Sequence, residues 1–151
     1  MVDKPDPRQL AEIAAKAAAS KLATDVVAID VHAQTIITDI FLICSGDNPR
    51  QVRAIMNEID HACHDNGAAP KTIEGNDEFR WVLMELPGVI VHIFLDEERE
   101  YYGLERLWND CPRIDLPDLE EAARAGRAQE YSQDELKDAQ QDAENLIVGL
   151  D

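Results

Sequence analysis

Residues 79–95 read FRWVLMELPGVIVHIFL, and this stretch gives the clearest indication of the fold class. Two largely apolar runs, Phe79 to Leu86 and Val89 to Leu95, flank Pro87-Gly88, a dipeptide typical of a tight turn. The second run is apolar at successive positions, so both of its faces should be covered by other residues. We therefore predict two adjacent strands, of which the second lies in the interior of a sheet.

Two further strands are expected upstream of this stretch. The sequences DVVAIDV at 25–31 and TDIFLICSG at 38–46 contain the runs Val26 to Val31 and Thr38 to Cys44, which are rich in apolar and β-branched residues. The polar residues 32–35 between them predict a turn. We therefore expect these two strands to be antiparallel neighbours.

Helices are expected before and after this pair of strands. Asp6 followed by Pro7 is a helix-start signal, and apolar residues then recur at helical spacing over residues 7–22. Asn48-Pro49 repeats the start signal, and Asn66-Gly67 is a stop signal. The apolar face of this second helix holds Val52, Ile55, Met56, Ile59 and Cys63. Together these elements predict a compact α/β fold, a mixed β-sheet flanked by helices.

The segment REYYGLERLW at 99–108 follows the last apolar strand and interleaves charged with aromatic and aliphatic side chains. In a helix over residues 97–108, we expect one face to pack into the core and a neighbouring stripe to face a partner. The first face holds Tyr101, Leu104 and Trp108, and the stripe holds Glu98, Tyr102 and Glu105. The alternative is an amphipathic helix that only closes the core with its aromatic residues.

The charge of the chain restricts its partners. It has 31 acidic and 14 basic residues, for a formal net charge of −17. Nucleic acids and anionic membranes are held by clusters of Lys and Arg, so we expect neither as a direct partner. A basic protein is the partner that this charge favours.

Length and cysteine content indicate one domain in a reducing compartment. A chain of 151 residues suits a single core with some surplus. The three cysteines are odd in number and form no C-x-x-C, so neither a disulfide framework nor a cysteine zinc site is indicated. The chain shows no signal-peptide pattern and no run near the ~20 apolar residues of a membrane span. We expect a cytoplasmic protein.

The composition changes after Pro112. Residues 114–151 hold eleven acidic and three basic residues. We therefore assign residues 1–113 to the α/β domain and residues 114–151 to an acidic C-terminal extension, largely disordered or marginally helical. Ser132 and Glu135 have the spacing of a capping box and predict a marginal helix near 133–148.

The sequence contains no recognisable catalytic arrangement. Ser45-Gly46 could seat a phosphate at a helix N-terminus, but a single glycine beside Asp47 favours a tight turn. The strands offer Asp30, Asp39 and Glu85 one at a time, with no D-x-D pair to hold Mg²⁺, and there is no G-x-S-x-G. We predict no catalytic residue and no cofactor.

The histidines also have simple interpretations. His61 and His64 share a helix face at a spacing compatible with metal ligation, but no second cluster completes a shell, so we predict no metal site. His92 lies in the middle of a strand and is expected to be a hydrogen-bonded core residue. Cys44 lies in an apolar strand, where a thiolate is disfavoured.

Four ordered stretches resemble the ribosomal silencing factor family, RsfS, also called Iojap-like or DUF143. They are residues 25–46, RQVRAI at 50–55, the EG, W and VHIF elements within 74–94, and the run at 99–108. The family signature closes with R-E-x-Y-x-L-E-R-L-W, which the last stretch matches. The family is described as having a nucleotidyltransferase-like fold, so the resemblance implies that fold here.

The resemblance also implies a function. A family member would bind the large ribosomal subunit through ribosomal protein uL14 and sterically block association with the small subunit, repressing translation in starvation or stationary phase. It would not be an enzyme, and it could form a homodimer when free. The expected partner-binding residues are Trp81, Glu98, Tyr101, Tyr102, Glu105, Arg106 and Trp108. The alternatives are a divergent enzyme of nucleotidyltransferase fold and an acidic adaptor for another basic protein.

Overall fold

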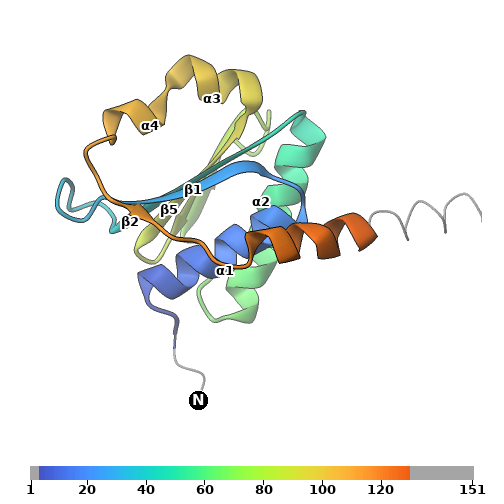
Figure 1. Cartoon of the computed structure of the whole chain (residues 1–151), viewed down its shortest axis with the longest axis horizontal. Coiled ribbons are helices and arrows are strands. Elements are labelled where there is room, and N and C mark those ends of the chain that lie inside the picture. The colour runs from blue at the N-terminus through green and yellow to red at the C-terminus, as the bar shows by residue number, and fades with distance from the viewer. Residues whose placement is uncertain (1–3, 130–151) are drawn as a thin grey trace, which may run out of the picture.

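The computed structural model describes residues 4–129 as helices on both faces of one six-stranded sheet (Figure 1). The strands are β1 (Thr24–Asp30), β2 (Ile40–Gly46), β3 (Thr72–Glu74), β4 (Trp81–Leu86), β5 (Val89–Leu95) and β6 (Arg113–Ile114). The helices α1 (Pro7–Ser20) and α2 (Pro49–Asp65) cover one face, and α3 (Asp96–Tyr102) and α4 (Leu104–Leu107) lie over the other. The predicted α/β fold with a mixed sheet is confirmed.

The sheet has the strand order β3-β4-β5-β2-β1-β6. Only β2 and β5 pair in parallel, while the remaining neighbours of this sheet are antiparallel. The interior position predicted for β5 is confirmed, as is the antiparallel pairing of β1 with β2. Chain segments far apart in sequence therefore meet at the centre of the sheet, where the end of β2 lies beside the end of β5.

Capping residues fix the starts of the two long helices. Asp6 accepts a hydrogen bond from the Gln9 amide (2.8 Å), and the Gln9 side chain accepts one from the Asp6 amide (3.0 Å). Asn48 accepts from the Gln51 amide at 2.9 Å. These bonds satisfy amides that have no partner within the helix. Both predicted helix starts are confirmed.

Alternation along the strands divides the core into two layers. On one face, residues such as Leu42, Val91 and Ile93 pack against α1 and α2 in the larger layer. On the other, Ile29, Val31, Ile43 and Phe94 form a smaller layer that is partly covered by Leu104 and Trp108. The second layer is the one on which α3 and α4 rest.

The prediction of a single helix over residues 97–108 is wrong, because the helix is interrupted at Gly103. This glycine adopts a left-handed conformation, with φ of 55°, and its amide donates to the carbonyl of Arg99 at 3.0 Å. That geometry ends α3 and gives α4 a new axis direction. Helical spacing across residues 101–108 therefore does not describe a single face.

The folded region extends beyond the boundary expected between residues 113 and 114, which falls within β6. Ile114 pairs with Ala28 of β1, and a helical segment at 119–129 follows alongside α1 (Figure 1). Apolar residues in this acidic stretch pack against the larger layer of the core. A count of charged residues cannot detect this packing. Residues 114–129 are thus folded rather than disordered, and the helix expected near 133–148 lies outside the described residues.

No helix between residues 4 and 129 combines the length and apolar character required to cross a membrane.

Candidate functional site

Aromatic rings from the sheet, from the end of α3 and from the end of α4 pack into a continuous layer between the sheet and the two helices. Trp81 stacks on Phe94 with ring centroids 4.9 Å apart and contacts Tyr102 at 4.7 Å. Phe41 meets both His92 and Trp108 edge-on, each at 5.1 Å. We call this set the aromatic layer: Phe41, Trp81, His92, Phe94, Tyr102 and Trp108. Trp81 and Trp108, which we expected at the docking site, are half-buried in it and support the helices from below.

His92 is the buried polar member of the aromatic layer. Its Nδ1 accepts a hydrogen bond from Trp81 Nε1 at 3.2 Å, which assigns the proton of the neutral ring to Nε2. Burial lowers the pKa of His92 to about 4, so the ring is neutral near pH 7. The prediction of a hydrogen-bonded core histidine is confirmed.

Above the aromatic layer, the two helices expose large apolar side chains. Tyr101 is 81% exposed, Leu107 is 75% exposed and Tyr102 is 49% exposed. Helical spacing over 97–108 placed Tyr101 on the core face, and that expectation is wrong. The partner-binding role that the resemblance implies for Tyr101 stays a prediction. Gly103 changes the direction of the chain, so that Leu104 and Trp108 contact the core while Tyr101 points to solvent.

The two glutamates expected to face a partner form ion pairs within the chain. Glu98 binds Arg80 through Nη2 at 2.6 Å and Nε at 2.9 Å. This hydrogen bond raises the pKa of the Arg80 guanidinium. Glu98 ties α3 to the start of β4, which lies 18 residues away in the sequence.

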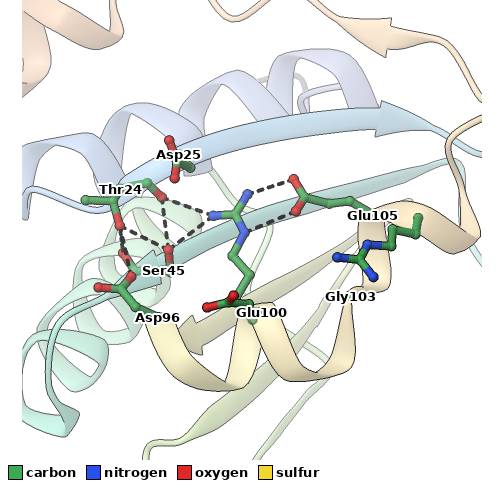
Figure 2. A pocket seen from close by; sticks show the side chains of 9 residues that line it. Thr24, Asp25, Ser45, Asp96, Glu100, Gly103 and Glu105 are labelled. Carbon is green, nitrogen blue, oxygen red and sulfur yellow. Dashed lines mark hydrogen bonds and ion pairs between the residues drawn. The ribbon is translucent and has the colours of Figure 1, made fainter.

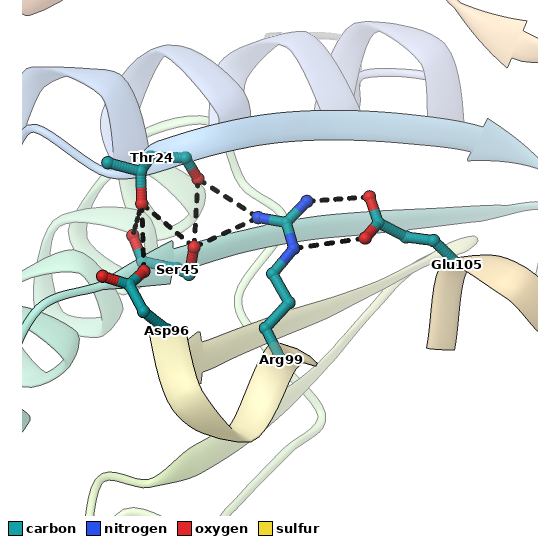
Figure 3. Close-up of polar contacts among 5 residues, drawn as sticks. All are labelled: Thr24, Ser45, Asp96, Arg99 and Glu105. Carbon is teal, nitrogen blue, oxygen red and sulfur yellow. Dashed lines mark hydrogen bonds and ion pairs between the residues drawn. The ribbon is translucent and has the colours of Figure 1, made fainter. Parts of the chain in front are cut away.

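Glu105 forms the second internal pair, with Arg99 (Figure 3). Arg99 Nη2 and Nε donate to the two carboxylate oxygens of Glu105 at 2.8 and 3.3 Å. Arg99 Nη1 also donates to the Thr24 carbonyl and to Ser45 Oγ, both at 3.2 Å. One guanidinium thus joins α3, α4, β1 and β2. Sequence reasoning missed Arg99, because its partners on the strands lie 75 and 54 residues away.

A polar hollow of about 430 Å³ lies beside this network (Figure 2). It is lined by Thr24, Asp25, Ser45, Asp96, Arg99, Glu100, Gly103, Glu105 and Arg106. Most of these residues form hydrogen bonds with one another. For example, Asp96 accepts a hydrogen bond from Thr24 Oγ1 at 3.3 Å. A hydrogen bond with Asp96 also raises the pKa of the neighbouring Asp47 carboxyl. The hollow is an open polar surface, and its residues do not form a nucleophile and base pair.

Two histidines on α2 and the buried Cys44 lie outside this network. His61 pairs with Asp65 and His64 with Asp60, each at 3.4 Å on the exposed face of α2. Within residues 4–129 no three His, Cys, Asp or Glu side chains are grouped so as to hold a metal ion. Burial raises the pKa of Cys44 to about 12, which confirms that its thiolate is disfavoured.

Comparison with known proteins identifies what the chain is similar to. The family model described as "Ribosomal silencing factor during starvation" matches residues 4–142. Ribosomal silencing factor RsfS of Bacillus subtilis is 45% identical over 109 residues, which are 72% of this chain and 92% of that protein. A solved Bacillus halodurans structure has a TM-score of 0.65 and 38% identity, covering 72% of this chain and 99% of its own. A solved Chromobacterium violaceum structure has a TM-score of 0.68 and 25% identity, covering 75% of this chain and 93% of its own.

Proposed function

Since the chain belongs to the ribosomal silencing factor family, a ribosome-associated role in silencing translation follows, and we propose a mechanism for that role. The chain binds the large ribosomal subunit through ribosomal protein uL14. Its bulk then blocks association with the small subunit by steric exclusion, which represses translation in starvation or stationary phase. The name of the family is that of a regulatory factor, and the proposed mechanism makes and breaks no bond.

The exposed aromatic pair on α3 is the observation that carries this proposal. Tyr101 and Tyr102 contact each other edge-on at 5.1 Å, and Tyr101 exposes most of its ring. Exposed tyrosines on a rigid base are typical anchors of protein interfaces, because they bury a large area with little loss of side-chain entropy. The aromatic layer provides that base, and exposed Leu107 on α4 extends the apolar surface.

The seven expected docking residues take three different roles in this proposal. Tyr101, Tyr102 and Arg106 are exposed and contact the partner directly. Trp81 and Trp108 support the surface from beneath, and Glu98 and Glu105 hold the helices in place through Arg80 and Arg99.

The overall charge favours the same partner class. A net charge of −17 is repelled by ribosomal RNA, so a basic ribosomal protein is the favourable landing site and direct nucleic-acid binding is not expected. We propose the cytoplasm as the place where the chain meets this partner. In the absence of the ribosome, the exposed apolar side chains can also support a homodimer.

Sedimentation of the purified chain with isolated large and small subunits tests the proposal, followed by a subunit-joining assay. We expect binding to large subunits alone and suppressed joining. Tyr101→Ala should weaken binding about 30-fold, as for an anchor residue worth about 2 kcal/mol, while Glu121→Ala on the opposite side should not. Binding to neither subunit would discard the proposal, and capture of another basic protein would favour the adaptor alternative.

A further inference from the structure

Acidic side chains around Tyr101 fall into two classes. Glu98 and Glu105 are only partly exposed, and their carboxylates are occupied by Arg80 and Arg99. Asp96, at the edge of the polar hollow, accepts a hydrogen bond from Thr24. These three carboxylates hold the chain's own structure together.

Glu97 and Glu100 are different. Both are exposed on α3, and neither forms an ion pair with any side chain of residues 4–129. Glu97 precedes Tyr101 by four residues, which places the two on the same side of the helix. Glu100 is adjacent to Tyr101 in the sequence, follows Glu97 by three residues and also lines the polar hollow (Figure 2). Glu97 therefore lies on the same side of α3 as Tyr101, and Glu100 lies on the neighbouring side of the helix, toward the polar hollow. Neither carboxylate is paired within residues 4–129.

We propose that Glu97 and Glu100 determine partner specificity by pairing with Lys or Arg side chains around the site that receives Tyr101. This inference rests on the proposed docking function and identifies the chemistry of the partner surface. A tyrosine anchor flanked by carboxylates fits an apolar depression with a basic rim. An RNA surface presents phosphates where the protein partner presents Lys or Arg side chains. The two glutamates repel these phosphates because both groups are negatively charged.

The exposure of the two glutamates predicts how they act. Charges at the rim of an interface mainly accelerate association, and salt screens their effect. Charge reversal at either position should slow association at low salt by about tenfold and leave dissociation nearly unchanged. Reversal at Glu98 or Glu105 should instead lower the melting temperature, because it removes an internal ion pair.

Glu97→Lys and Glu100→Lys test this proposal against Glu121→Lys as a matched control. Glu121 is exposed on the helical segment at 119–129, which lies beside α1 across the sheet from α3 (Figure 1). All three substitutions change the net charge equally. The measurements are the association rate with isolated large subunits at low and high salt and the melting temperature of each full-length variant.

We expect slow association for the two α3 variants at low salt, convergence with the unsubstituted chain at high salt, and near-normal association for Glu121→Lys. Glu97→Gln and Glu100→Gln should show a smaller loss with an unchanged melting temperature. Equal slowing by all three Lys variants would mean that only net charge matters and would overturn the proposal. Unaffected association of both α3 variants would also overturn it, whereas no binding by the unsubstituted chain would overturn the docking function itself.

Discussion

Arg99 shows how one side chain can hold together the elements that carry the proposed docking surface. Its side chain is 11% exposed, and the guanidinium donates to a carboxylate, a backbone carbonyl and a hydroxyl at once. Arginine suits this role because its planar fork presents several donors in fixed directions and keeps its charge when buried. The angle between α3 and α4, and with it the position of Tyr101, depends on this network.

Replacing Arg99 with Met should lower the free energy of unfolding by about 2 kcal/mol. Glu105 is then left as a partly buried charge without a partner, and the Thr24 carbonyl loses a donor. Urea denaturation measures the change. The double variant Arg99→Met/Glu105→Leu should recover part of the loss, with a coupling of about 1 kcal/mol or more. Strictly additive losses would show that the two residues do not stabilise each other.

His92 should make stability depend on pH. Its folded pKa of about 4 lies below the ordinary value of 6.5, so the unfolded chain takes up a proton that the folded chain excludes. The stability associated with neutral His92 is therefore full above pH 6.5 and is lost as the pH falls toward 4. At pH 5 the loss should be about 2 kcal/mol.

Urea denaturation at pH 7.5 and pH 5 measures this contribution by comparison with His92→Gln, whose amide oxygen can still accept from Trp81. The free energy of unfolding should fall less on acidification in the variant, because it lacks the imidazole that takes up a proton on unfolding. The carboxylates and exposed histidines are common to both proteins and contribute equally. An identical pH dependence of the two proteins would mean that, at pH 5, His92 is protonated in the folded chain as it is in the unfolded chain.

At the scale of the elements, local patterns predicted most of the fold. Asp6 and Asn48 identified the starts of two helices, and apolar runs identified β1, β2, β4 and β5. Such signals lie within a few residues of the element that they specify. The break at Gly103 was missed, since helical spacing continues across it in the sequence.

The proposed docking surface was less predictable, because its side chains are placed by contacts between distant segments. The resemblance pointed to both tyrosines and to both glutamates of the predicted stripe, while helical spacing placed Tyr101 in the core. It could not show that Arg80 forms an ion pair with Glu98, or Arg99 with Glu105. It therefore did not identify Glu97 and Glu100 as carboxylates without an ion pair. Helix phase cannot be assigned correctly when the break in the helix is unknown.

The helical segment at 119–129 should depend on Gly126. A Cβ atom at this position would lie 1.8 Å from the Ser20 carbonyl oxygen, on the backbone at the end of α1. Gly126→Ala should therefore displace the segment while α1 and the sheet remain folded. Hydrogen exchange should show lost protection over residues 119–129 and unchanged protection in β2 and β5. Exposed Ala125→Ser is the control, and retained protection in Gly126→Ala would contradict the close packing.

On the scale of the whole molecule, the two faces of the sheet are used differently. The large core layer under α1 and α2 stabilises the domain, and the helical segment at 119–129 adds to that side. The smaller layer carries the aromatic surface of α3 and α4. A partner bound there would leave α1, α2 and the helical segment at 119–129 directed away from it, as the proposed steric exclusion of the small subunit requires.

The contrast between a charged molecule and an aromatic contact predicts how binding responds to salt. The net charge of −17 acts over a distance set by the Debye length, about 10 Å at 0.1 M salt and about 3 Å at 1 M. The contacts of Tyr101 and Tyr102 are apolar and short-ranged, so salt does not screen them. Raising the salt from about 0.05 to 0.5 M should slow association with large subunits about tenfold and change dissociation less than about twofold.

Stopped-flow or surface-based kinetics with isolated large subunits separates the two rates, and protein-free ribosomal RNA serves as the control, to which no binding is expected at either salt. A dissociation rate that rises steeply with salt would place ion pairs at the centre of the interface, with the tyrosines at its rim. Salt-independent association would mean that the negative charge does not guide the chain to its partner, and selection against RNA would then depend on the shape of the α3 surface alone.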